Sequence, residues 1–400
     1  MLSASTRRLT AACAALGALM ALPVGLAPSA AAADVQSQQW YLSAMKAGEM
    51  WKTSTGKGVK VAVVDSGVNP STPSLQGQML VDEVPKSLSY GATKDFSGHG
   101  TTMAEIIAGT GHGGGLKGLA PGAKIVPYRV ATRGMSLSEE NKAPDMVAVI
   151  KAIANSDVKI INMSFGDDIS YDDEQAAIKY AASKGKLMFA GTGNDAETTN
   201  KKMYPASYPY VVGVSAVDKT ATVGKFSNHG FSADLAAPGV DLPAWCNAKF
   251  QSYCSHVNGT SDATAIASAS AALIWSAHPD WTANQVLSSL IDTASRQWSK
   301  DTPSSYLGYG VIRPRKVLED SNFNPGSANV DPLAVEDGVA KPKTSPSAPA
   351  KSTSGGETSA ADTSSKSSGN NLTWVVVGAA AALVVIGGAA FAVIRSRRRA

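Results

Sequence analysis

The sequence predicts an α/β domain in which a parallel sheet is covered by helices on both faces. Two observations lead to this prediction. Strand-like and helical segments alternate along the chain, and the strand-like segments are short apolar runs typical of buried strands. An apolar share of 44% over 400 residues is sufficient for a sizeable core.

The elements are expected in a regular order. Apolar runs predict strands over residues 60–64, 124–130, 158–163, 186–190 and 210–217, and helical periodicity predicts helices over residues 101–108, 146–154, 173–183 and 263–277. The last helix is rich in Ala and Ser and apolar on most sides, which is typical of a buried helix. Sites in open α/β sheets form where the carboxyl ends of strands meet loops, and Asp65 and Asn194 each follow a strand.

The two ends of the chain predict export and membrane anchoring. Residues 1–33 have the pattern of a signal peptide, with a basic start, an apolar stretch and small residues before Asp34. Residues 374–394 carry no charge and are long enough to cross a bilayer as one transmembrane helix. The basic residues 395–400 then form a cytoplasmic tail by the positive-inside rule, and we expect a single-pass protein of the cell membrane whose domain lies outside the cell.

Composition divides the remaining chain into a folded domain over residues 34–320 and a flexible Pro/Ser-rich linker over residues 321–373, which has too few large apolar residues to fold. The net charge of +4 comes from six terminal arginines, and the rest of the chain has 30 basic against 32 acidic residues. This balance gives no support for a nucleic-acid partner.

Three motifs in one chain order carry the candidate chemistry: VVDSGV at residues 63–68, GHGT at 98–101 and NGTS at 258–261. A serine hydroxyl becomes a nucleophile only beside a base that a carboxylate orients, so Asp65, His99 and Ser261 are the candidate catalytic residues. Asp65 alone would often be a turn residue, and Ser261 is also suited to cap the helix that follows it. A lipase or esterase is excluded because Gly-x-Ser-x-Gly is absent around Ser261.

In these motifs and their Asp, His, Ser order the chain resembles the subtilase family of serine endopeptidases. The resemblance implies that Asp65 orients His99, that His99 is the base for Ser261, and that Asn194 donates to the oxyanion from the segment 190–194. It also implies that Ser164, Phe165 and Gly166 bind an extended protein or peptide substrate as an added strand. No cofactor is implied. Residues 109–115, near which many subtilases bind calcium, offer no carboxylate, so we expect no tight metal site there, and ligation by carbonyl oxygens alone stays open.

Two cysteines remain after removal of the signal peptide, Cys246 and Cys254. In an exported chain they are expected to form a disulfide that closes a small loop. The alternative is a pair of metal ligands, but the sequence offers no His or Asp partners at suitable spacing.

The chain departs from the family pattern next to two of its catalytic motifs. Many subtilases continue with His-Val-Ala-Gly after the catalytic His-Gly-Thr, whereas this chain has TMAE at residues 102–105. They also have Met-Ala-Ser-Pro or Met-Ala-Ala-Pro after the serine, whereas this chain has DATA at residues 262–265. These exchanges flank the catalytic residues without removing them, so activity is still expected, and the exchanges open the question of altered specificity.

The signal peptide, the linker, the basic-flanked span and the lack of room for a folded pro-domain together resemble the mycosins, membrane-anchored subtilases of actinobacterial type VII secretion systems. This resemblance implies a secreted substrate and, as partners, components of a membrane secretion complex. The rival hypothesis is a subtilase-fold scaffold that stabilises such a complex with little or no proteolysis.

Overall fold

The computed structural model describes residues 35–230, 232–334 and 337–339. The described residues all belong to one compact unit. The predicted signal peptide, transmembrane helix 374–394 and basic tail, and the linker beyond residue 339, lie outside the described residues. Within the described part, no helix combines the length and apolarity needed to span a membrane.

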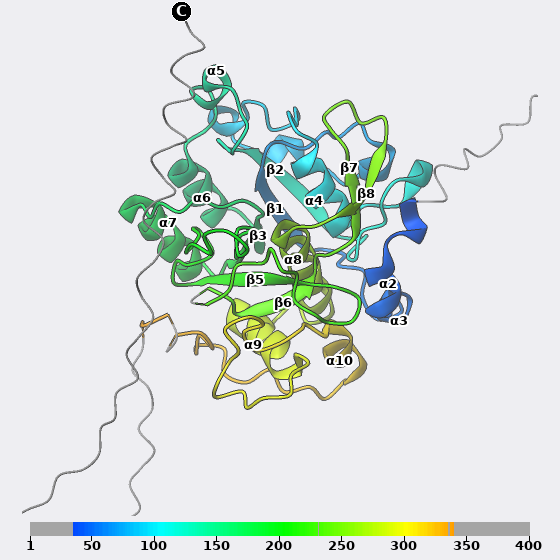
Figure 1. Ribbon diagram of the computed structural model, residues 1–400, viewed down its shortest axis with the longest axis vertical. Coiled ribbons are helices and arrows are strands. Elements are labelled where there is room, and N and C mark those ends of the chain that lie inside the picture. The colour runs from blue at the N-terminus through cyan, green and yellow to red at the C-terminus, as the bar shows by residue number, and fades with distance from the viewer. Residues whose placement is uncertain (1–34, 231, 335–336, 340–400) are drawn as a thin grey trace, which may run out of the picture. The chain divides into compact units, whose positions relative to one another are not determined.

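A six-stranded sheet forms the centre of the domain (Figure 1). Its strands are β1 (Lys60–Asp65), β2 (Lys124–Arg129), β3 (Ile160–Met163), β4 (Leu187–Gly191), β5 (Val211–Val217) and β6 (Leu235–Pro238). They lie in the order β2-β1-β3-β4-β5-β6, and every neighbouring pair is parallel. The parallel α/β prediction is therefore confirmed, and the carboxyl ends of all six strands lie along the same edge of the sheet.

Helices cover both faces of the sheet, and the alternation of side chains along β1 separates the two cores. Val61 and Val63 pack into a core with α4 (His99–Ala108) and α8 (Thr260–Ala277). Ala62 and Val64 point to the opposite face, where α6 (Met146–Ala154) and α7 (Asp172–Ser183) pack (Figure 1). Because successive side chains of a strand point to opposite faces, one apolar run serves both cores.

Shorter elements complete the domain. The helices are α2 (Trp40–Ala44), α3 (Ala47–Met50), α5 (Leu137–Glu140), α9 (Ala283–Thr293) and α10 (Pro314–Glu319), and the 3-10 turns are Pro73–Leu75, Val81–Glu83, Lys86–Leu88 and His112–Gly114. A separate antiparallel hairpin consists of β7 (Leu242–Trp245) and β8 (Tyr253–Val257).

Helix α8 passes through the core and carries Ser261 in its first turn. Nearly all of its residues are buried, because it packs against the sheet as well as against α4, α9 and α10. It begins at Thr260, three residues before the start predicted from the apolar pattern, because Thr260 to Asp262 are polar although they belong to the helix. The prediction of a buried helix is confirmed.

The predicted domain boundary at residue 320 is wrong. Leu333 is 1% exposed and packs in the core beside α8 and α9, and the Ala328 carbonyl oxygen accepts a bond from the Thr282 hydroxyl at 3.0 Å. Polar composition suggested a linker, but a few apolar side chains and backbone bonds are enough to hold this segment against α9.

Candidate active site

Asp65 and His99 meet where β1 ends and α4 begins. Asp65 is 1% exposed, and its Oδ1 lies 2.8 Å from His99 Nδ1 and accepts the Ser66 N–H at 2.7 Å. A carboxylate can only accept, so Nδ1 carries the hydrogen and Nε2 is the basic nitrogen of the neutral ring. The His99 side chain keeps 40% of its surface exposed, so this oriented base is accessible.

The close approach of β1 to α4 depends on a glycine. A Cβ at Gly100 would lie 2.2 Å from the Gly67 carbonyl oxygen and 3.1 Å from the Asp65 Cβ. Gly67 itself has a φ of +99°, which side chains rarely tolerate. Both glycines come from the sequence motifs, and they allow the carboxylate and the imidazole to meet.

Asp95 holds the beginning of α4, and it was not among the predicted site residues. Its Oδ1 accepts the Gly98 N–H at 2.8 Å, and its Oδ2 accepts the Thr101 N–H at 2.9 Å and the Thr101 hydroxyl at 2.7 Å. The free N–H groups at a helix start need acceptors of this kind. The only sign of this role in the sequence is that Asp95 lies four residues before the first residue of α4.

Ser261 is bonded to the predicted substrate-binding segment. Its hydroxyl donates to the Ser164 carbonyl oxygen at 2.9 Å, and the Ser164 hydroxyl donates to the Ser261 carbonyl oxygen at 3.0 Å. A hydroxyl has one hydrogen, so Ser261 must release Ser164 before it can donate to His99. Ser164 itself is buried, whereas Phe165 and Gly166 are partly exposed.

The Asn194 side chain is held in one orientation by Thr260. Its Oδ1 accepts the Thr260 N–H at 2.9 Å and the Thr260 hydroxyl at 3.0 Å. A backbone N–H can only donate, so the atom facing it is the amide oxygen, and the donating Nδ2 is turned away from Thr260. Thr260 precedes Ser261, so the amide is fixed beside the candidate nucleophile.

One cleft of about 900 Å³ brings the predicted residues together. Its lining includes Asp65, His99, Ser164, Phe165, Gly166, Asn194 and Ser261. These residues end strand β1, follow strands β3 and β4, or lie at the start of helices α4 and α8, as expected of a site at the carboxyl edge of the sheet.

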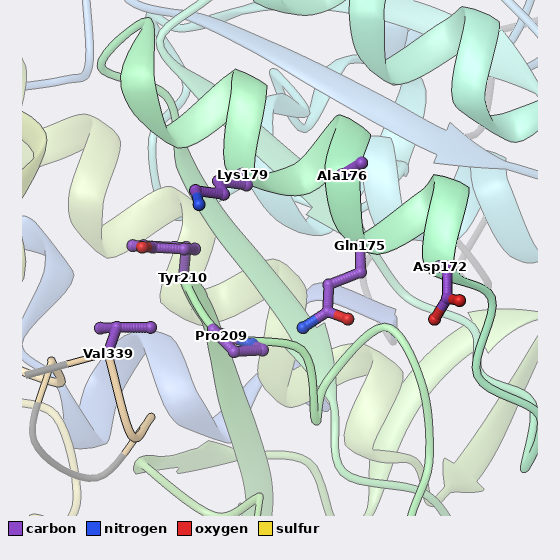
Figure 2. Close-up of a pocket in the computed structure, with 7 residues that line it drawn as sticks. All are labelled: Asp172, Gln175, Ala176, Lys179, Pro209, Tyr210 and Val339. Carbon is purple, nitrogen blue, oxygen red and sulfur yellow. The ribbon is translucent and has the colours of Figure 1, made fainter.

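A smaller hollow of about 310 Å³ lies between α7 and the start of β5 (Figure 2). Its lining consists of Asp172, Gln175, Ala176, Lys179, Pro209, Tyr210 and Val339. In Figure 2, Gln175 and Lys179 extend from α7 toward Pro209 and Tyr210. None of the lining residues is a serine, cysteine or histidine, so the larger cleft is the candidate active site.

Carboxylates dominate the electrostatics around His99. Although 40% of the His99 side chain stays exposed, the surrounding protein desolvates the ring and lowers its pKa. Asp65 in the first place, and then Asp262 and Asp95, outweigh this effect and raise the pKa of His99 to about 9. Negative groups favour the charged imidazolium over the neutral ring. The site therefore holds a base that binds its proton tightly.

The hairpin β7–β8 packs against α4 and is closed by the predicted disulfide. Cys246 and Cys254 are joined, with their Cα atoms 4.9 Å apart. The Trp245 backbone N–H donates to the Thr102 hydroxyl at 3.0 Å, and the Tyr253 hydroxyl donates to Glu105 Oε2 at 2.7 Å. Two of the residues that depart from the family pattern, Thr102 and Glu105, thus bind this hairpin.

The described residues contain no group of three or more His, Cys, Asp and Glu side chains that could hold a metal ion. In the segment 109–115, the carbonyl oxygens of Gly111 and Gly115 accept bonds from Gln36 Nε2 at 2.8 and 2.9 Å. The side-chain amide of Gln36 thus donates to two carbonyl oxygens of the segment near which many subtilases bind calcium.

Comparison with known proteins gives concordant results for sequence and fold. A family model described as the subtilase family matches residues 56–310. Subtilisin E of Bacillus subtilis (strain 168) is 32% identical over 288 residues, which cover 71% of this chain and 72% of that protein. The structure of the MycP3 protease from the type VII (ESX-3) secretion system is 27% identical with a TM-score of 0.57, covering 70% of this chain and 87% of that one. The structure of MycP1 with the N-terminal propeptide removed is 26% identical with a TM-score of 0.57, covering 72% and 99%.

Proposed function

This chain belongs to the subtilase family and is a subtilisin-like serine endopeptidase, and we propose that Asp65, His99 and Ser261 are its catalytic triad. The observation that carries the assignment is the bond between Asp65 Oδ1 and His99 Nδ1 in the cleft that also holds Ser261. An oriented base beside a serine at a helix start is the arrangement that activates a hydroxyl.

In the proposed reaction, the Ser261 hydroxyl exchanges its bond to Ser164 for one to His99 Nε2 and attacks the peptide carbonyl carbon. His99 takes the proton, and Asp65 stabilises the imidazolium through Nδ1–H. The oxyanion receives hydrogen bonds from Asn194 Nδ2 and from the Ser261 N–H at the start of α8. His99 then gives its proton to the leaving amine, and water releases the acyl group by the same steps.

Labelling with a fluorophosphonate probe tests the triad directly. The full-length protein is expected to become covalently labelled, and Ser261→Ala and His99→Ala are expected to lose the label. Ser270→Ala is the matched control, because Ser270 is a buried serine on the same helix whose hydroxyl donates to the Ile266 carbonyl oxygen. A folded wild type that fails to label, or a labelled Ser261→Ala variant, would refute the assignment.

We further propose that the peptidase is anchored in the cell membrane by residues 374–394 and acts with a type VII secretion system. Support comes from the uncharged segment followed by RSRRR, and from the likeness to proteases whose structures are described as parts of type VII systems. The substrate would be a protein or peptide bound in extended form along residues 164–166.

Fractionation of cells tests the anchoring proposal. The full-length chain is expected in the membrane fraction after carbonate washing, and a variant that ends at residue 373 is expected in the soluble or secreted fraction.

Native gels of mild-detergent extracts test the association with a secretion complex, and we expect the protein to comigrate with a large assembly. Secretion that persists at the wild-type level with Ser261→Ala but fails without the protein would favour the scaffold hypothesis for the complex.

A further inference from the structure

A buried acid follows the proposed nucleophile directly. Asp262 lies in the first turn of α8 and is 2% exposed. Within the described part of the chain, no group donates to its Oδ1. An acid in the first turn of a helix gains some stabilisation from the helix dipole. That gain is small beside the cost of removing a carboxylate from water, so helix capping alone does not explain Asp262.

The groups that face Asp262 come from two neighbouring helices. Helix α4 contributes His99, and α2 contributes the buried hydroxyl of Tyr41. Burial raises the pKa of Asp262 to about 7, and His99 is the charged partner that opposes this rise. The same pair acts in the other direction, because Asp262 follows Asp65 among the carboxylates that raise the pKa of His99.

We propose that Asp262 is a positioning residue of the peptidase reaction, a second carboxylate that acts through His99 and stabilises its imidazolium. The inference rests on the proposed triad. Asp65 holds the ring by a direct bond, whereas Asp262 acts from the adjoining helix through its charge in an interior that screens charges poorly. The positive charge on His99 forms only when Ser261 has given up its proton, so an ionised Asp262 favours the transition state over the resting enzyme.

The negative charge of Asp262 should also lower kcat/KM on the acid side of the pH profile. A carboxylate near His99 holds the proton on the ring to higher pH, which removes the free base. Replacement of Asp262 by Asn should therefore shift the acid limb of kcat/KM to lower pH by about half to one unit. The variant should be slower than wild type on the alkaline plateau and relatively faster at acidic pH. A side chain with only a packing role would lower the rate equally at every pH.

The experiment is the pH profile of kcat/KM for peptide hydrolysis by the full-length protein and its variants. Asp262→Asn and Asp262→Met remove the same charge with different shapes, and both should shift the limb in the same direction. Glu105→Gln is the matched control. Glu105 is also a buried acid, but it lies on α4 and its carboxylate accepts a hydrogen bond from the Tyr253 hydroxyl. It should leave the limb closer to its wild-type position than either Asp262 variant does.

A second measurement covers variants that fold but are too slow to assay. The His99 pKa is read from the imidazole NMR signal in Ser261→Ala and in Ser261→Ala combined with Asp262→Asn, and the second should titrate at lower pH. Unchanged limbs and an unchanged imidazole titration would overturn the role of Asp262 while leaving the triad intact. Peptidase activity that survives Ser261→Ala would instead overturn the proposed function.

Discussion

Replacement of Asn194 by aspartate separates the two roles of this side chain. The variant keeps an oxygen for the Thr260 N–H and hydroxyl, which lie at 2.9 and 3.0 Å in the wild type, but it loses the amide donor. In subtilisin, the loss of one such donor lowers kcat by about 10²–10³, or roughly 2.7–4 kcal/mol. We expect a loss at least as large here, because the new carboxylate oxygen stands in the place of the amide donor and repels the oxyanion. KM and the thermal midpoint should stay nearly unchanged, because the bonds to Thr260 remain.

The contribution of Thr260 can be worked out from the same geometry. Thr260→Val removes the hydroxyl bond to Asn194 and the weaker bond that the same hydroxyl accepts from the Gly193 N–H at 3.3 Å, and it leaves the backbone bond to Asn194 in place. A neutral hydrogen bond contributes about 1 kcal/mol, which corresponds to about a fivefold change in rate. We therefore expect kcat to fall about 3- to 10-fold, far less than in Asn194→Asp.

The assay is hydrolysis of a chromogenic peptide, with kcat and KM measured separately and folding followed by circular dichroism. Thr264→Val is the matched control, since the Thr264 hydroxyl is buried in the same helix and donates to the Thr260 carbonyl oxygen. A well-folded Asn194→Asp variant whose kcat stays within about threefold of wild type would refute the oxyanion role. An equal loss in Thr264→Val would show that the effect of Thr260 arises from the helix.

Three further changes test the framework around the site. Gly100→Ala should lower kcat by at least about 10² and also lower the thermal midpoint, because its Cβ would lie 2.2 Å from the Gly67 carbonyl oxygen. Gly48→Ala, where a Cβ meets nothing within 4 Å, should do neither. Burial raises the pKa of Glu105 from 4.5 to about 7. The folded state therefore binds the proton more tightly, and the free energy of unfolding should fall by up to roughly 3 kcal/mol as pH rises through that window. Urea titrations should show a steeper slope in wild type than in Glu105→Gln, which keeps only the contribution of the other buried acid, Asp262, and equal slopes would contradict the prediction. Replacement of Cys246 and Cys254 by serine together opens a small loop and should lower the free energy of unfolding by about 2–3 kcal/mol. An unchanged urea midpoint would count against that stabilisation.

The strands and the candidate triad could be predicted from the sequence because each is marked by a short, continuous run of residues. The apolar runs predicted the ends of β1 to β5 to within two residues. The motifs identified Asp65, His99 and Ser261, and the structure places all three in one cleft. The short strand β6 and the hairpin β7–β8 lack a long apolar run, so nothing local distinguished them from loops. Their existence depends on partners elsewhere in the chain, such as the pairing of Leu235 with Val214.

Burial was the property that the sequence did not reveal. Glu105 and Asp262 were visible as departures from the family pattern, but an acid beside a motif is ordinarily solvated. Only the packing of α4 against α8 shows that both side chains are removed from water. Asp95 was missed for a related reason, since its role depends on how the loop before α4 folds back onto the helix start.

The carboxylates around His99 have different duties, and their combined charge sets the working range of the enzyme. Asp65 bonds to Nδ1, Asp95 caps the helix that carries the ring, and Asp262 lies buried beside the nucleophile. Together they raise the pKa of His99 to about 9, so the free base becomes abundant only in alkaline solution. The imidazolium that forms in the transition state gains from all of these charges, whereas the neutral ring does not. We therefore expect low activity at acidic pH and a well stabilised transition state at alkaline pH, and replacement of Asp262 should weaken both effects.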